Sequence, residues 1–126
     1  MAGTENDIVR VTDRRGVTLV HIRIDSILHD PEVEALGRAL AAMAEVPGRR
    51  VVLSFLGVEQ LTSRVLGQLI YARKRLKETG GELRLADIDP RLYEVFVISR
   101  LDRFFRIFER EDEAIASFHE EGGGLA

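Results

Sequence analysis

Residues 51–81 read VVLSFLGVEQLTSRVLGQLIYARKRLKETGG, and this stretch decides the fold. Its first five residues form a short apolar run typical of a strand that is covered on both faces, and residues 56–60 break that pattern. From Val65 onward the apolar residues recur with the spacing of an amphipathic helix, which we expect to end at Gly80-Gly81. The stretch therefore predicts a strand, a turn and a helix, with two hydroxyl residues, Thr62 and Ser63, at the N-terminus of the helix.

The residues before this stretch predict a hairpin and a helix. Residues 8–11 and 17–22 look like two strands joined by a turn at residues 13–16. Residues 25–29 are expected to form a loop. A helix should follow, capped by Asp30, with Pro31 at its first position, and should run to about Glu45 before Pro47-Gly48 stops it.

The residues after the stretch continue the alternation of strands and helices. We expect a strand at residues 83–86, a helix capped by Asp89, a strand at 104–108 and a last helix at 111–118. Phe104, Phe105 and Phe108 are expected to be core residues. The resulting order ββαβαβαβα predicts an α/β fold, with a mostly parallel sheet and one antiparallel edge strand. We expect a single domain over residues 1–120 and a flexible tail over residues 121–126.

Composition narrows the functional classes. A chain of 126 residues with 45% hydrophobic and 31% charged residues is one ordinary globular domain, and a net charge of −3 argues against nucleic-acid binding. The absence of cysteine excludes disulfides, thiol catalysis and thiolate metal sites. The N-terminal residues lack the pattern of a signal peptide, and no apolar run is long enough to span a bilayer, so we expect a cytoplasmic protein without membrane insertion.

Residues that could carry catalysis or bind a cofactor are scarce. His21, His29 and His119 lack the short fixed spacing of metal ligands, and no glycine-rich phosphate loop occurs, so we expect neither a metal nor a cofactor. The basic residues at 73–77 spread around an exposed helix face without aromatic residues to stack bases, which does not favour nucleic acid. The plentiful carboxylates serve solubility and helix dipoles in this interpretation.

Thr62 and Ser63 leave two interpretations open. One hydroxyl could simply cap the helix, because Ser and Thr often accept a hydrogen bond from a free backbone amide there. Alternatively, the same amides and the positive end of the helix dipole favour a phosphoryl group, so phosphorylation could act as a switch. Gly67, which is costly inside a helix, indicates close packing or access at this turn, and Arg64 and Gln68 are expected to flank the hydroxyls with donors.

The chain also resembles a known family. Residues 51–67 and 73–85, together with Leu101-Asp102-Arg103-Phe104-Phe105 and Glu113-Ala114-Ile115, closely resemble the STAS domain, the sulphate transporter and anti-sigma factor antagonist family. The predicted order of elements is also that of the family, so the resemblance covers nearly the whole chain.

The resemblance implies a stand-alone regulatory module and not an enzyme. Such a module binds an anti-sigma factor of the serine kinase type and is phosphorylated by it at the start of the second helix, where Ser63 falls, with Thr62 as a secondary candidate. Asp25 loosely matches an acidic residue that the family uses for partner contact. Two acids typical of the antagonists are missing, because Thr62 and Ser54 occupy their positions. We therefore take Asp25, Ser54, Thr62, Arg64, Gly67 and Gln68 as candidate partner-binding residues.

Two alternatives accompany this hypothesis. The same fold could serve as a constitutive scaffold in a signalling assembly, or as the small soluble subunit of a lipid transporter, without a phosphorylation switch. A nucleotide-binding protein is the weaker alternative, because no phosphate loop is visible. Pairing into a homodimer is left open.

Overall fold

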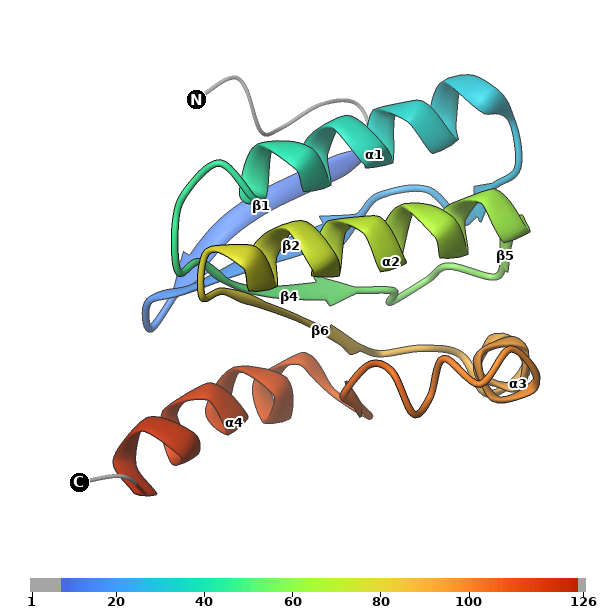
Figure 1. Ribbon diagram of the computed structural model, residues 1–126. Helices are drawn as coiled ribbons and strands as arrows, with labels where there is room; N and C mark the ends of the chain where they lie inside the picture. Colours follow the sequence, from blue (N-terminus) through green and yellow to red (C-terminus); the bar gives the residue numbers. More distant parts are fainter. Residues whose placement is uncertain (1–7, 125–126) are drawn as a thin grey trace.

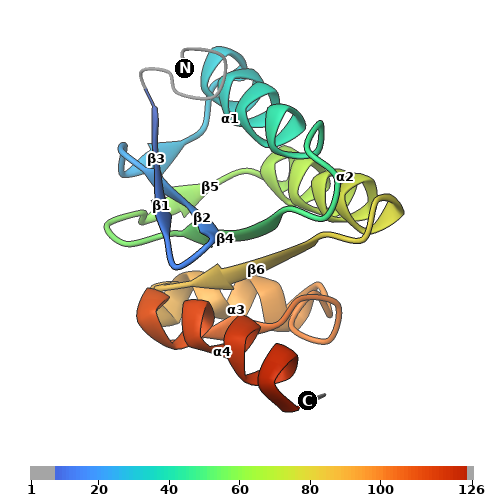
Figure 2. The same cartoon turned by 90° about the vertical axis from the view of Figure 1, so that its left-hand side faces the viewer.

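The computed structural model describes residues 8–124 and has helices on both faces of one central sheet. The sheet has the strand order β1-β2-β4-β6-β7, in which β1 is antiparallel to β2 and every other pair is parallel. Helices α1 and α2 lie on one face, and α4 lies on the other, as Figure 1 shows from the side and Figure 2 along the layers. This arrangement confirms the predicted fold class. The elements are β1 (Val9–Arg14), β2 (Val17–Ile22), β3 (Ser26–Ile27), α1 (Asp30–Met43), β4 (Arg50–Ser54), β5 (Gln60–Leu61), α2 (Ser63–Glu78), β6 (Glu82–Ala86), α3 (Pro90–Ile98), β7 (Ile107–Phe108) and α4 (Glu111–Gly124).

The N-terminal hairpin forms as predicted, but its turn is shorter than the expected residues 13–16, because Asp13 and Arg14 belong to β1. Strands β1 and β2 pair from Val9 opposite Ile22 to Arg14 opposite Val17, so only Arg15 and Gly16 remain in the turn. Both turn residues have positive φ, 57° and 80°, which is the requirement of the tight turn that matches the twist of a two-residue hairpin.

The start of α1 differs from the prediction. Asp30 is already helical, and His29 is the N-cap residue. The Glu32 carboxylate accepts hydrogen bonds from the backbone amides of Leu28 and His29, both at 3.2 Å, the second of which is the bond that the third helical residue makes back to the N-cap in a capping box. The helix ends at Met43, two residues before the expected Glu45.

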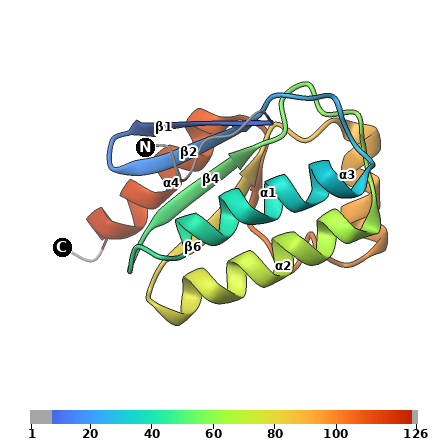
Figure 3. The ribbon, with the colours of Figure 1, turned by 90° about the horizontal axis from the view of Figure 1, so that it is seen from above.

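The strand, turn and helix of the opening stretch form the centre of the molecule. Strand β4 lies between β2 and β6, and α2 runs back over the sheet beside α1, as the view from above shows (Figure 3). The return to β6 requires glycine twice. Gly80 has a φ of 86°, and a Cβ on Gly81 would lie only 2.4 Å from the backbone oxygen of Arg49.

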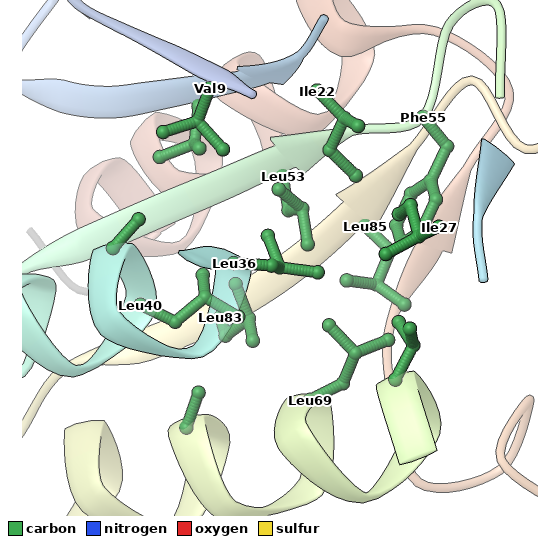
Figure 4. Close-up of a cluster of buried hydrophobic side chains, with 14 of the residues drawn as sticks. Val9, Ile22, Ile27, Leu36, Leu40, Leu53, Phe55, Leu69, Leu83 and Leu85 are labelled. Atoms are coloured by element: carbon green, nitrogen blue, oxygen red, sulfur yellow. The ribbon is translucent and has the colours of Figure 1, made fainter. Parts of the chain in front are cut away.

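Apolar side chains fill both faces of the sheet. On the side of α1 and α2, Leu53 and Leu85 point from the strands toward Leu36 and Leu69 of the helices (Figure 4). A smaller cluster on the opposite face packs under α4. Its members alternate with those of the first cluster along the strands and are Val17, Leu19, Val52, Ala86, Ala114, Ile115 and Phe118. Burial on both faces explains why β2 and β4 carry apolar residues on both sides of the sheet, among them the uninterrupted run Val51-Val52-Leu53.

Two expectations about strands are corrected. The loop at residues 25–29 contains the short strand β3, which pairs with β5 in a second, two-stranded sheet. The expected strand at 104–108 is reduced to β7, because the amide of Phe105 bonds to the oxygen of Leu101 at 2.9 Å and closes a helical turn. Phe105 is buried, as predicted, and Phe108 is half-buried.

Phe104 is not a core residue. Its side chain is 38% exposed and lies under the guanidinium of Arg73, 4.4 Å from the ring centroid. The last helix, expected to end at Phe118, continues to Gly124 and therefore includes part of the expected tail. Residues 125–126 lie outside the described residues.

Candidate functional site

The candidate residues follow the ends of parallel strands. Because β2, β4 and β6 are parallel, their carboxyl ends meet at one edge of the sheet, which we call the carboxyl edge. Asp25 follows β2, Ser54 ends β4, and Asp87 follows β6. The chain after β4 then returns to α2, whose N-terminus lies at the same edge (Figure 3). Open α/β sheets commonly place their binding sites at this edge.

The small sheet of β3 and β5 joins the loop of Asp25 to the N-terminus of α2. The backbone oxygen of Asp25 accepts hydrogen bonds from the amides of Glu59 at 2.7 Å and Gln60 at 3.2 Å. The amide of Thr62 donates to the oxygen of Ile27 at 3.3 Å, directly before the helix begins. Asp25 and Ser63 therefore belong to one connected surface, which the sequence indicated only through the family resemblance. The carboxylate of Asp25 is exposed there.

Thr62 and Ser63 occupy the predicted positions but differ in their surroundings. Thr62 is the N-cap residue, yet its hydroxyl makes no capping hydrogen bond, and Oγ1 is buried without a partner. Ser63 is the first helical residue and is exposed. The structure thus gives no support to Thr62 as the hydroxyl that caps α2, and it leaves the Ser63 side chain accessible to another protein.

The N-terminus of α2 has no negative charge of its own. The first turn of α1 contains Asp30 and Glu32, α4 begins with three acidic residues, and the Asp89 carboxylate of α3 accepts from the amide of Arg91 at 2.9 Å. The first turn of α2 contains no acidic residue, and its cap makes no side-chain hydrogen bond. Of the four helices in the described part of the chain, α2 is therefore the one without a carboxylate of its own at the positive end of its dipole.

The other predicted residues of α2 lie in three different environments. The Arg64 guanidinium pairs with the Asp30 carboxylate and so joins the first turns of α1 and α2 at an exposed position. Gln68 does not flank the hydroxyls, because its amide fills the space above Gly37 of α1, where a Cβ would lie 2.5 Å from Oε1. Gly67 is exposed, and a Cβ there would meet nothing within 4 Å. Close packing within the chain therefore does not explain Gly67.

Ser54 has a structural role that leads to a residue missed from the sequence. Its side chain is completely buried, so it cannot touch a partner in this conformation. Its hydroxyl accepts from the amide of Leu56 at 3.3 Å and donates to Oδ2 of Asp87 at 2.8 Å. A carboxylate therefore stands beside Ser54, supplied by the neighbouring strand.

Asp87 shows the features of a constrained site residue. Its φ is 62°, an uncommon value for a residue with a side chain. Burial raises the pKa of its carboxyl group, the bond from Ser54 opposes that rise, and the charge of Glu111 adds to it. The register that pairs Ser54 with Ala86 makes this contact, and the sequence carries no signal for that register beyond the strands themselves.

His21 lies at the same end of the sheet, on the side of α4. It pairs with Ser54 across β2 and β4, and its Nε2 lies 2.9 Å from Oε1 of Glu111. Among the described residues, no group of three or more His, Cys, Asp or Glu side chains is placed to hold a metal ion. No helix within residues 8–124 is long and apolar enough to cross a membrane.

Comparisons with known proteins agree on one family. The model of the family described as STAS domain matches residues 9–114. BtrV of Bordetella bronchiseptica, described as a candidate anti-sigma factor antagonist, is 30% identical over 95 residues, which cover 75% of this chain and 82% of that protein. An anti-sigma-factor antagonist (STAS) domain protein from Planctomyces limnophilus has a TM-score of 0.79 and 27% identity, covering 86% of this chain and 96% of that one. The phosphorylated form of the Bacillus cell fate determinant SpoIIAA has a TM-score of 0.66 and 18% identity, covering 87% of this chain and 98% of that one, and shares the fold.

Proposed function

This chain belongs to the STAS domain family, and from that premise we propose that it binds a serine-kinase-type anti-sigma factor and is controlled by phosphorylation of Ser63. The family match and the relationship to BtrV confirm the resemblance drawn from the sequence, and they make the chain an anti-sigma factor antagonist-like STAS domain. In the proposal it acts by binding and not by catalysis. The partner recognises the carboxyl edge, from the loop of Asp25 to the first turns of α2.

The N-terminus of α2, which has no carboxylate of its own, carries the proposal. Ser63 is exposed at the first position of a 16-residue helix whose first turn has no acidic residue. A phosphoryl group there would add about −1.5 to −2 charges next to free backbone amides and the positive end of the dipole. The other described helices already have carboxylates at this position, so the modification fits α2 better than any of them.

Phosphorylation of Ser63 would change the contacts of the neighbouring Arg64. The guanidinium pairs with Asp30 in the unmodified chain. A phosphoryl group on the adjacent Ser63 offers the same guanidinium a stronger acceptor, because charge-assisted bonds from arginine to phosphate are short and often bidentate. We infer that phosphorylation draws Arg64 away from Asp30 and changes both the charge and the shape of the surface that the partner meets.

The first experiment maps the modification. The protein is incubated with ATP and a serine-kinase-type anti-sigma factor encoded near it, and the phosphate is located by mass spectrometry. We expect one phosphate on Ser63, none in the Ser63→Ala variant, and normal modification of Thr62→Val. An unmodified protein beside a kinase that phosphorylates a control substrate would reject the switch.

The second experiment measures binding of the same partner by calorimetry. Ser63→Asp is compared with Ser63→Asn, which has the same shape without the charge. We expect Asp to weaken binding by about tenfold or more and Asn by about twofold or less, because an added charge is misplaced against a surface selected to fit the neutral serine. Circular dichroism of both variants should match the parent, since Ser63 is exposed.

A second candidate function is a constitutive binding subunit without a switch. The observation that favours it is Thr62, a residue without charge directly before Ser63, where the antagonists resembled by this chain have an acid. A stable complex whose affinity is the same for the parent, Ser63→Asp and Ser63→Asn would support this candidate against the first. Both candidates place the chain in the cytoplasm, where a partner that controls transcription would be found.

A further inference from the structure

A pocket lies between α3 and the last strand of the sheet. It has a volume of about 620 Å³ and is walled by Pro90, Tyr93 and Glu94 of α3 and by Ile107 and Phe108 of β7. We call it the α3–β7 pocket. In both side views, α3 lies below β6 and α1 lies above it (Figure 1, Figure 2). Its size is within the range of sites that hold a ligand or an anchoring side chain.

Helix α3 leaves several apolar side chains exposed, wholly or in part, in the structure of residues 8–124. It buries only Leu92 and Phe96, whereas Tyr93 is 38% exposed, Val97 45% and Ile98 82%. Tyr93 and Val97 are four residues apart and form one stripe that leads out of the pocket. A helix that is apolar on most sides is usually buried, and exposed apolar patches usually mark interaction sites.

The formally charged residues that line the pocket have one sign, although one guanidinium lies beside its wall. The ionisable side chains with formal charge in its wall are Glu94 and Glu109, and no basic residue is among those that line it. The aromatic ring of Phe108 already attracts a cation, because the guanidinium of Arg106 lies 5.3 Å from its centroid. Tyr93 provides a second ring. Two carboxylates beside two aromatic rings suit a cationic head on an apolar stem, which describes an arginine or a lysine side chain.

We propose that the α3–β7 pocket is a docking site for a basic and apolar segment of a partner protein. An arginine or lysine of that segment enters the pocket toward Glu94 and Glu109, and apolar neighbours cover the stripe of Tyr93 and Val97. A symmetric pair of copies of this chain would bring the same carboxylates face to face, so charge favours a basic partner over a second copy. The docking does not depend on Ser63, which lies at the N-terminus of α2.

The test uses a short fluorescent peptide in which leucine and arginine alternate, with a matched peptide that has glutamate in place of arginine. Titration into the isotope-labelled protein should shift the amide signals of Tyr93, Val97 and Ile107 with the basic peptide only. The double variant E94Q/E109Q should bind it about tenfold more weakly, since charge-assisted contacts are lost. The control double variant E45Q/E78Q removes two carboxylates at the opposite edge and should stay within about twofold of the parent.

Four results would overturn the proposal. The first three are the absence of signal shifts at millimolar peptide, shifts confined to α1 and α2, and equal binding of the two peptides. The fourth is equal weakening in both double variants, which would mean that diffuse charge explains the binding. Self-association that E94Q/E109Q abolishes would show that a second copy is the occupant. Tyr93→Ala should also weaken binding while the signal dispersion stays native, and Ser63→Asp should leave peptide affinity unchanged. The docking site and the phosphorylation switch can therefore fail separately.

Discussion

Gly67 lies within α2 and Gly81 lies directly before β6, and the space around the two glycines differs. A Cβ on Gly67 would meet nothing within 4 Å, whereas a Cβ on Gly81 would lie 2.4 Å from the oxygen of Arg49. We expect Gly67→Ala to raise the free energy of unfolding by about 0.5–1 kcal/mol, because alanine restricts the unfolded chain and favours the helix. Gly81→Ala should lower it by about 1–3 kcal/mol through overpacking.

Urea titrations measure both changes through the transition midpoint, and an unchanged slope shows that the unfolded states are comparable. The same Gly67→Ala protein tests the surface. If it is more stable and yet binds the anti-sigma factor more weakly, Gly67 lies in the interface. A destabilised Gly67→Ala protein would contradict the open environment described above.

The raised pKa of Asp87 predicts the direction in which the stability of the protein changes with pH. Burial raises its pKa above the usual value, with the Ser54 bond opposing the shift and Glu111 adding to it, so the folded protein keeps this proton to higher pH than the unfolded chain does. Stability from this group therefore decreases as pH rises above the usual aspartate pKa, and the ionised carboxylate costs stability at neutral pH.

Asp87→Asn should remove that cost while keeping the geometry. Asparagine tolerates the φ of 62°, and its side-chain oxygen can still accept from Ser54. We expect the variant to be more stable than the parent at about pH 7, with a difference that shrinks as the pH falls through the raised folded pKa and vanishes below the ordinary aspartate pKa of about 4, where the parent residue becomes protonated in both states. Urea unfolding of both proteins across this range measures the difference. A difference independent of pH would show that the charge is not its cause.

At the scale of elements, α4 depends on a buried arginine. Arg84 of β6 is 4% exposed and donates to Oγ of Ser117 at 2.7 Å, while its guanidinium lies 3.9 Å from the centroid of the Phe118 ring. Ser117→Ala removes this acceptor from a buried charge and should cost about 1–3 kcal/mol of stability in urea unfolding. Ser99→Ala, at an exposed position after α3, is the control and should change stability by less than about 0.5 kcal/mol. Equal effects of the two variants would contradict this role of Arg84.

The elements that sequence reasoning found are the four helices and the strands of five or six residues. The 16 residues of α2 repeat their apolar face often enough to be recognised, and the position of Ser63 followed from that. Strands β3 and β5 have two residues each, which is too short for any alternation to appear, so the surface that joins Asp25 to Ser63 could not be predicted from spacing. Phe104 and Phe105 have a high β propensity and therefore suggested a strand. They form a turn instead, because their backbone amides donate to the oxygen of Leu101.

The candidate site also has one part that could be predicted from the sequence and one part that could not. The exposed Ser63 at the start of a helix was predictable from local signals. The contact between Ser54 and Asp87 joins residues 33 positions apart and depends on strand register, which tertiary packing decides.

The whole molecule has two apolar clusters of unequal size on the two faces of one sheet. The larger cluster joins α1, α2 and α3 to the strands. The smaller cluster joins α4 to the strands through residues that include Ile115. Because α4 packs on the second face against β4, β6 and β7 through this smaller cluster, we expect it to open without unfolding the rest. Ile115→Ala, at a buried position, should lower the free energy of this local opening by about 2–5 kcal/mol and speed amide exchange in α4.

Leu69→Ala provides the matched comparison. It removes a similar side chain from the larger cluster, where Leu69 is completely buried, and should lower the free energy of global unfolding by a similar amount of about 2–5 kcal/mol. Its effect on amide exchange should therefore spread over α1, α2 and the central strands, because the slowest amides of these elements exchange by global unfolding. Hydrogen exchange followed by mass spectrometry separates the two patterns. If Ile115→Ala speeds exchange in α1 and α2 as much as in α4, the two faces unfold as one cooperative unit. The carboxyl edge would then be coupled to α4 through β4 and β6, which both clusters share.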